Sequence, residues 1–129
     1  KLYFLDTGLA AWLLGIQSSD QLLAHPARGA LFETWVVAEM AKQRYNQGRP
    51  LNLYYWRDSQ GLEVDVLFET PDGLQAIEIK SGATFASDWP AALSKWARLQ
   101  SAPIPLPWVI YGGEGQMQRQ GCLATGWNA

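Results

Sequence analysis

The sequence contains very few of the residues that build disulfide frameworks, zinc sites and histidine-based catalytic triads. The single cysteine, Cys122, excludes an internal disulfide, and the default location is therefore the cytosol. The single histidine, His25, stands before Pro26 in a stretch that we interpret as a loop. Without a cluster of Cys and His residues we expect no zinc site, and a catalytic triad would have His25 as its one weak candidate.

Patterns that bind nucleotides or cross membranes are also missing. Neither the GxxxxGKS/T phosphate loop nor GxGxxG occurs, so we expect no phosphate-loop hydrolysis by this chain alone. No apolar run reaches the roughly 18 residues of a membrane span. The apolar start, KLYFLDTGLAAWLLG, is interrupted by Asp6 and Gly8 and fits a signal peptide poorly. We therefore expect a cytoplasmic protein without a membrane partner.

The charge balance is slightly acidic. Ten Lys and Arg residues face twelve Asp and Glu residues, which gives a net charge of −2. This balance argues against a broad surface that coats nucleic acid, because such domains are usually basic. A local basic rim around a carboxylate site remains compatible with it.

Apolar and aromatic residues are plentiful. The chain of 129 residues is 48% apolar and holds seven tryptophans, enough for one domain with its own core. The first residue is Lys1 rather than Met. We therefore expect the sequence to be a piece of a longer protein.

Apolar periodicity and turn signals predict helices and strands in alternation. The expected elements are an extended entry or short strand (2–5), a short helix capped by Asp6 or Thr7 and ending near Gly15, a loop that includes a turn of helix (16–27), a long helix (29–46), three strands (51–58, 62–69 and 74–81), a helix capped by Ser87 or Asp88 (87–100), a buried strand (107–113) and a last edge strand (122–127). Short connections between the three strands predict an antiparallel meander. The order predicts an α/β fold, a mixed sheet with helices packed on it.

Charged residues recur within the second and third strands. The segment EVDVLFETPDGLQAIEIK (63–80) alternates apolar and charged residues around a Pro-Asp-Gly turn. By parity, Glu63, Asp65, Leu67 and Glu69 are expected on one face, and Val64, Val66 and Phe68 on the other. Glu78 and Lys80 share a face of the third strand. The hairpin therefore predicts Asp65, Glu78 and Lys80 on one side of the sheet.

Two interpretations of this face remain open at this point. The first is a solvated strand face with cross-strand ion pairs from Asp65 or Glu63 to Lys80. The second is a metal pocket, because two close carboxylates repel each other unless a positive group joins them. Mg²⁺ prefers carboxylate oxygens, carbonyl oxygens and water, and a lysine two residues beyond Glu78 could hold a water or a phosphate oxygen.

The long helix favours the pocket. At 100° per residue, Glu39, Lys42 and Gln43 fall on a solvated arc, whereas Glu33 falls among apolar residues. Glu33 is therefore expected to point inward and to need a partner. The candidate partners are Arg44, Arg57, Lys80 and a metal cluster on the sheet.

These residues resemble the PD-(D/E)xK phosphodiesterase superfamily. The matching elements are a glutamate on a first helix in GALFE (29–33), an aspartate on a second strand in EVD (63–65), and E-x-K on a third strand in EIK (78–80). The GxxxE spacing is similar to the RecB-like branch. The resemblance implies a restriction-endonuclease-like fold, with a helix, a three-stranded antiparallel meander, a helix and a strand.

The chain as a whole resembles the carboxy-terminal domain, of unknown function, of bacterial and archaeal AAA-type ATPases. The similar stretches are KLYFLDTGLAAWLLG, GALFETWVVAE, LYYWRDSQGLEVDVLFE, IEIKSG and VIYGG, across residues 1–113. The resemblance implies a single domain over 1–129, with residues 1–27 leading in from an amino-terminal ATPase module of the same polypeptide.

The superfamily pattern implies a role for each matching residue. Asp65 and Glu78 would bind Mg²⁺ or Mn²⁺ together with the Ile79 carbonyl, and Lys80 would orient or help deprotonate the attacking water. Glu33 would complete the metal site or position that water. Glu63 would support the site, and Arg57 is expected to pair with Asp58 or Glu63. The helix over 87–100 departs from the RecB-like pattern because it has no QxxxY motif.

Three functions follow as alternatives. The first is a Mg²⁺-dependent nuclease domain with DNA as its partner. The second is a non-catalytic module that docks onto its own ATPase or another protein, a role that seven tryptophans and an apolar amino-terminal helix would suit. The third is a metal-dependent hydrolase of a different phosphodiester.

Overall fold

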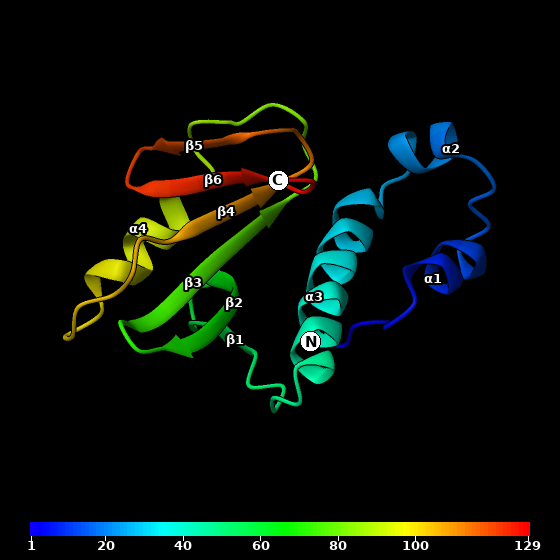
Figure 1. The fold of residues 1–129 in the computed structure, drawn as a ribbon. Coiled ribbons are helices and arrows are strands. Elements are labelled where there is room, and N and C mark those ends of the chain that lie inside the picture. The colour runs from blue at the N-terminus through cyan, green and yellow to red at the C-terminus, as the bar shows by residue number, and fades with distance from the viewer. The chain divides into compact units, whose positions relative to one another are not determined.

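The computed structural model describes all 129 residues. They form two compact units, Lys1–Leu51 and Asn52–Ala129. The first unit is helical, and the second contains a sheet and one helix (Figure 1). The positions of the two units relative to one another are not determined. Helices and sheet together give the α/β class expected from the sequence.

Three helices form the first unit. They are α1 (Thr7–Leu13), α2 (Ser19–Ala24) and α3 (Arg28–Asn46). The Asp6 carboxylate accepts a hydrogen bond from the Leu9 N–H at 3.0 Å, and this confirms the predicted cap of the first helix. Ser18 caps α2 in the same way through the Gln21 N–H at 3.2 Å. Residues 2–4 have no regular secondary structure and Leu5 lies in a bend, so no strand forms there.

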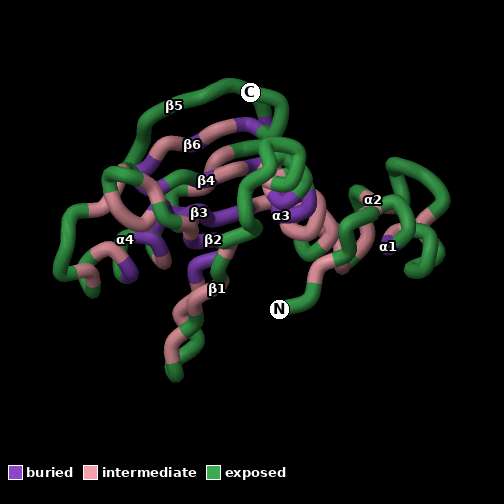
Figure 2. Tube along the Cα trace, turned by 60° about the horizontal axis from the view of Figure 1, so that its bottom comes forward, coloured by how far each residue is buried: buried purple, intermediate pink, exposed green.

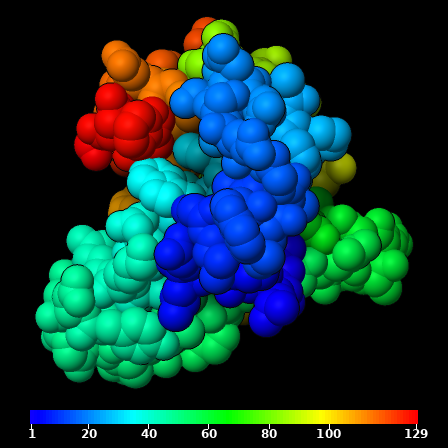
Figure 3. Space-filling model, turned by 90° about the vertical axis from the view of Figure 1, so that its right-hand side faces the viewer, coloured from blue at the N-terminus to red at the C-terminus, as the bar shows by residue number.

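The start of the chain leaves apolar side chains at the surface. Ala10 is the one buried residue of α1, and α2 has none. Eight large apolar side chains are at least 44% exposed, namely Leu2, Phe4, Leu5, Leu9, Trp12, Leu13, Leu14 and Leu23. Figure 2 shows α1 and α2 mostly in the colour of exposed residues, and Figure 3 shows the first residues at the surface that faces the viewer. Exposed apolar surface is typical of interaction sites where it forms a large patch.

The long helix α3 confirms the predicted bounds to within one residue. It ends where Gly48 takes a positive φ of 65°, a conformation that glycine adopts without strain. On the predicted solvated arc, Lys42 donates a hydrogen bond to Glu39 at 2.8 Å, with both side chains about half exposed. Even α3, the longest of the four helices, lacks the combined length and apolar character that crossing a membrane requires.

The second unit is built on a six-stranded mixed sheet. Its elements are β1 (Tyr54–Arg57), β2 (Glu63–Thr70), β3 (Gly73–Lys80), α4 (Ala91–Arg98), β4 (Trp108–Tyr111), β5 (Gln116–Arg119) and β6 (Cys122–Gly126). The strand order is β1-β2-β3-β4-β6-β5. The β1-β2-β3 meander is antiparallel, as predicted, whereas β3, β4 and β6 run parallel. The helix α4 connects two parallel neighbours, β3 and β4.

The β2–β3 hairpin follows from its turn. Pro71 and Asp72 connect the strands, and Gly73 takes a φ of 120° that disfavours other residues. The ladder runs from the pair Thr70–Gly73 to the pair Val66–Ile77. The predicted hairpin and its short turn are therefore confirmed.

A single apolar cluster lies between the sheet and α4. Its buried members are Val64, Leu67, Ala76, Leu93, Trp96, Val109 and Cys122. Trp96 is the largest of them and is 2% exposed. Burying large side chains from four strands and a helix together stabilises this unit through the hydrophobic effect.

Two sequence-based predictions of elements were wrong. The helix expected over 87–100 spans only Ala91–Arg98, and its N-cap is Pro90 rather than Ser87 or Asp88. The helix begins late because residues 87–90 form turns, in which Trp89 donates to the Ala86 carbonyl and Ala91 to the Asp88 carbonyl. The strand at Cys122–Gly126 lies inside the sheet, and β5 forms the edge instead. All four residues of β5 are exposed, so apolar alternation did not reveal this strand.

Three glycines lie where the loop after β3 packs closely against the ends of β4 and β6. A Cβ on Gly112 would lie 2.4 Å from the Ser81 carbonyl oxygen, and one on Gly113 would lie 2.2 Å from that of Ala83. A Cβ on Gly126 would lie 2.5 Å from the Gly113 carbonyl oxygen. Backbone therefore packs directly on backbone at the carboxyl ends of the parallel strands.

Candidate metal centre

Asp65 lies where the pairing of β2 becomes irregular. Opposite it, the β1–β2 register shifts between Tyr54 and Trp56, which is typical of a β-bulge. The bulge also explains a wrong prediction. Leu67 was expected on the face opposite Val64, yet both side chains join the same core cluster. Simple alternation along β2 fails because the bulge changes the direction of the side chains.

The Asp65 carboxylate takes the place of a backbone acceptor. The β2–β3 ladder stops at Val66–Ile77, and beyond it the Ile79 N–H donates to Asp65 Oδ2 at 2.8 Å. Asp65 is only 8% exposed. Within a strand the N–H and C=O of one residue point to the same neighbouring strand. The Ile79 carbonyl therefore points towards β2, on the side where Asp65 lies.

Glu78 and Lys80 form an ion pair on β3. Lys80 Nζ lies 2.7 Å from Glu78 Oε1, and the side chains are 36% and 8% exposed, respectively. The register sets Glu78 beside Val109 and Lys80 beside Tyr111. Because paired residues share a face of the sheet, Glu78 and Lys80 lie on the face that α4 covers further along the strands.

The surroundings of Lys80 keep its ammonium charged. Partial burial acts to lower the pKa of Lys80, but the hydrogen bond to Glu78 and the negative charges of Glu78, Asp65 and Asp88 outweigh this effect. The net result is a pKa above the ordinary value for lysine. At neutral pH Lys80 is therefore a fixed positive charge beside two buried carboxylates.

Asp88 was not among the residues singled out from the sequence, which pointed to it only as a helix cap. It is exposed in the turn before α4 and acts electrostatically on Lys80. No signal in the sequence relates Asp88 to the β2–β3 hairpin, because it is the loop that begins at Ser81 that brings Asp88 within electrostatic reach of Lys80.

Glu33 belongs to the first unit and has partners there. Its Oε1 accepts hydrogen bonds from Lys1 Nζ at 2.6 Å and from Tyr3 Oη at 2.8 Å. Its side chain is 20% exposed, so it is mostly covered, as the helix phase predicts. Neither Lys1 nor Tyr3 was among the partners that the sequence suggested for Glu33. Arg44, which was one of those candidates, donates instead to the Pro50 carbonyl. The role of Glu33 in a site with residues of β2 and β3 stays a prediction.

Glu63 and Arg57 form a separate pair at the end of the hairpin. Arg57 Nη1 lies 3.1 Å from Glu63 Oε1, one of the two partners predicted for it. The Tyr55 hydroxyl donates to the same oxygen at 2.8 Å. Glu63 therefore has partners on β1.

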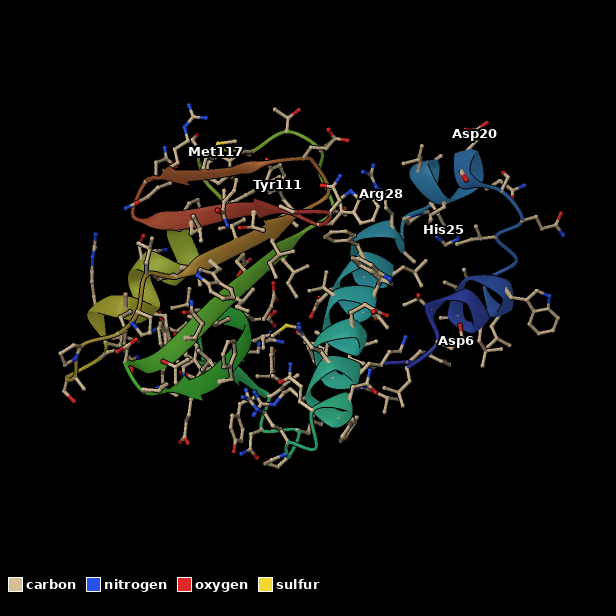
Figure 4. The ribbon with its side chains drawn as sticks, in the orientation of Figure 1. Asp6, Asp20, His25, Arg28, Tyr111 and Met117 are labelled. Carbon is tan, nitrogen blue, oxygen red and sulfur yellow. The ribbon has the colours of Figure 1, made fainter.

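His25 is the loop residue that was predicted, and its Nδ1 accepts from the Ala27 N–H at 3.0 Å (Figure 4).

The donor set fits a hard divalent cation in its chemistry. Asp65 and Glu78 offer carboxylate oxygens and Ile79 offers a carbonyl oxygen, which are the ligand types that Mg²⁺ prefers. A carboxylate has about four lone-pair positions, and the hydrogen bond from the Ile79 N–H uses one of those of Asp65. No group of three or more His, Cys, Asp or Glu side chains is arranged to hold a metal. Water and substrate would have to supply the remaining ligands, as is usual for Mg²⁺.

Removing the ammonium should destabilise the fold. We expect Lys80→Met to lower the free energy of unfolding at pH 7 by about 1–2 kcal/mol, because Glu78 would keep a buried charge without this partner. The expected loss is smaller than for a fully buried ion pair, because Lys80 is about one-third exposed. Urea denaturation measures the change.

Two further variants serve as controls. Lys80→Met with Glu78→Gln should recover most of the loss, because the buried charge is gone. Lys42→Met should cost less than about 0.5 kcal/mol, since its pair with Glu39 is exposed. Equal losses for Lys80→Met and Lys42→Met would contradict this account of Glu78.

Comparison with known proteins identifies relatives without an assigned activity. Residues 28–128 match the family described as "Domain of unknown function (DUF4143)". Two mycobacterial proteins, "Uncharacterized protein Rv2008c" of Mycobacterium tuberculosis and "Uncharacterized protein Mb2031c" of Mycobacterium bovis, are each 37% identical over 84 residues. The aligned segment covers 65% of this chain and 18% of each relative's length. No solved structure matches the chain.

Proposed function

Since the chain belongs to the DUF4143 family, we propose that this domain is a metal-dependent phosphodiesterase of the PD-(D/E)xK kind, acting on DNA. One observation supports this function above all others. Two acidic side chains, Asp65 and Glu78, are buried at the irregular end of one hairpin, beside a lysine that is kept charged. A purely solvated strand face would leave these carboxylates in water.

The chain's own residues have distinct roles in this proposal. Asp65 and Glu78 bind the cation with the Ile79 carbonyl, and the Ile79 N–H holds the Asp65 carboxylate in place. When bound, Mg²⁺ or Mn²⁺ supplies Lewis-acid stabilisation of the charge that builds on the scissile phosphate. Lys80 orients a water or a phosphate oxygen as a point charge, because its raised pKa favours the ammonium form.

Glu33 is the fourth residue of the proposed site. The PD-(D/E)xK resemblance assigns it to the metal or to the attacking water. In the first unit its carboxylate is held by Lys1 and Tyr3. The proposal therefore requires Glu33 to exchange the Lys1 contact for the site or to act through a water.

The test combines metal binding with cleavage. We expect Mn²⁺ to bind the wild-type chain in calorimetry at millimolar concentration or below, and Mn²⁺ or Mg²⁺ to support cleavage of single- or double-stranded DNA. EDTA should abolish cleavage. If no metal binds at millimolar concentration and none of the DNA forms is cut, the nuclease proposal is wrong.

A second function is favoured by a different observation. The exposed apolar side chains from Leu2 to Leu23 suit a domain that binds another protein surface. In that proposal the partner is an ATPase module of the same polypeptide, and the Glu78–Lys80 pair is structural. Metal binding separates the two functions, because a docking module has no need of a cation at Asp65.

A further inference from the structure

The loop between β3 and α4 is fixed beside the Lys80 ammonium. The Gly112 N–H donates to the carbonyls of both Lys80 and Gly82 at 3.0 Å. The Trp89 ring centroid lies 6.1 Å from that of Tyr111, the residue paired with Lys80. A Cβ on Gly82 would come within 2.9 Å of the Trp89 ring. Asp88, next to Trp89, is therefore anchored near the end of β3 rather than free to swing away.

The charges near Lys80 are predominantly negative. Asp65, Glu78 and Asp88 each act on the Lys80 ammonium. The charges that act on Lys80 therefore come from three carboxylates. Asp65 and Glu78 are buried and have roles in the proposed function, whereas Asp88 is exposed and has none. An approaching phosphodiester, itself negative, would meet Asp88 at the solvent side.

We propose that Asp88 is an electrostatic gate that makes nucleic-acid binding at this site depend on a divalent cation. The inference rests on the proposed function, because it assumes that a phosphodiester approaches Lys80. Without a cation, Asp88 adds repulsion at short range, and this repulsion weakens as the salt concentration rises. A dication held by Asp65 and Glu78 offsets the negative charge of these carboxylates, and the phosphodiester can then approach. Asp88 thereby protects nucleic acid from unproductive binding to the metal-free domain.

Binding of a labelled single-stranded oligonucleotide tests the gate. Fluorescence anisotropy gives its Kd in EDTA and in Ca²⁺, and a gel afterwards verifies that the strand is intact. In EDTA we expect Asp88→Asn to bind about three- to tenfold more tightly than wild type, as expected when one nearby charge is removed. In Ca²⁺ the difference should shrink. Asp72→Asn, at the exposed turn of the β2–β3 hairpin, has the same charge change and should alter neither Kd.

The outcomes separate this inference from the proposed function. If wild type binds the oligonucleotide and Asp88→Asn matches it in EDTA, the gate is wrong and the proposed function stands. If Asp72→Asn tightens binding as much as Asp88→Asn, net charge alone is responsible and the gate is again wrong. If no protein binds in either condition, the gate and the proposed function both fail.

Calorimetry adds a readout independent of DNA, because Asp88→Asn should weaken Mn²⁺ binding a few-fold and Asp72→Asn should not.

Discussion

Asp65→Asn is expected to lower the rate of DNA cleavage by at least about a hundredfold while the domain stays folded. The asparagine oxygen can still accept from the Ile79 N–H, so the hairpin keeps its geometry. The loss of charge removes a ligand from the cation, whose stabilisation of the transition state is worth several kcal/mol, and each 1.4 kcal/mol corresponds to about tenfold in rate. Initial rates with Mn²⁺, compared with those of wild type, measure the effect.

A matched substitution on the same strand controls for the charge change. Glu69 is exposed on β2 near the turn, and Glu69→Gln should keep the wild-type rate. Circular dichroism should show the same thermal transition for Asp65→Asn and wild type to within a few degrees. Cleavage by Asp65→Asn at the wild-type rate would assign any observed activity to a different site or to a contaminant.

Trp96→Ala is expected to cause the largest loss of stability of any single substitution considered, about 3–5 kcal/mol. Trp96 is 2% exposed in the cluster between α4 and the sheet, and alanine would leave a cavity among Leu93, Val109 and their neighbours. Since small domains are stable by only about 5–15 kcal/mol, the variant should be partly unfolded at modest urea concentrations. Circular dichroism in urea follows the transition.

Trp12→Ala provides the comparison, because Trp12 also stands on a helix but is 72% exposed. We expect a change within about 0.5 kcal/mol, as for other surface substitutions. Alanine is also the better helix former. A large loss for Trp12→Ala would mean that the exposed face of α1 packs against something in solution, and would favour the docking function.

Local patterns predicted much of the fold. The long helix and the antiparallel meander are set by short-range signals, namely apolar periodicity, caps and tight turns, so their positions could be found from the sequence. The parallel pairing of β4 and β6 depends on contacts far apart in the chain. The exposed β5 has no apolar face, and only the turn at Gln120 and Gly121, both with positive φ, indicates a hairpin there.

The sequence proposed residues for the candidate site, and their role stays a prediction, whereas the contacts of these residues were not predicted. Motif spacing pointed to Asp65, Glu78 and Lys80, and the structure gives the ion pair between the last two. The Ile79 N–H bond to Asp65 could not be foreseen, because it depends on a bulge that breaks alternation in β2. The partners of Glu33 were missed as well, since Lys1 and Tyr3 lie about thirty residues away in an extended segment.

The hydrogen bond from Ile79 to Asp65 gives the domain a built-in spectroscopic probe. Most amide protons of a sheet report only on backbone pairing, but this one is bonded to an acidic side chain. Its chemical shift and its exchange with solvent should therefore respond to whatever binds that carboxylate. A ¹⁵N-labelled sample could register a cation at Asp65 through one resonance, before any substrate is known.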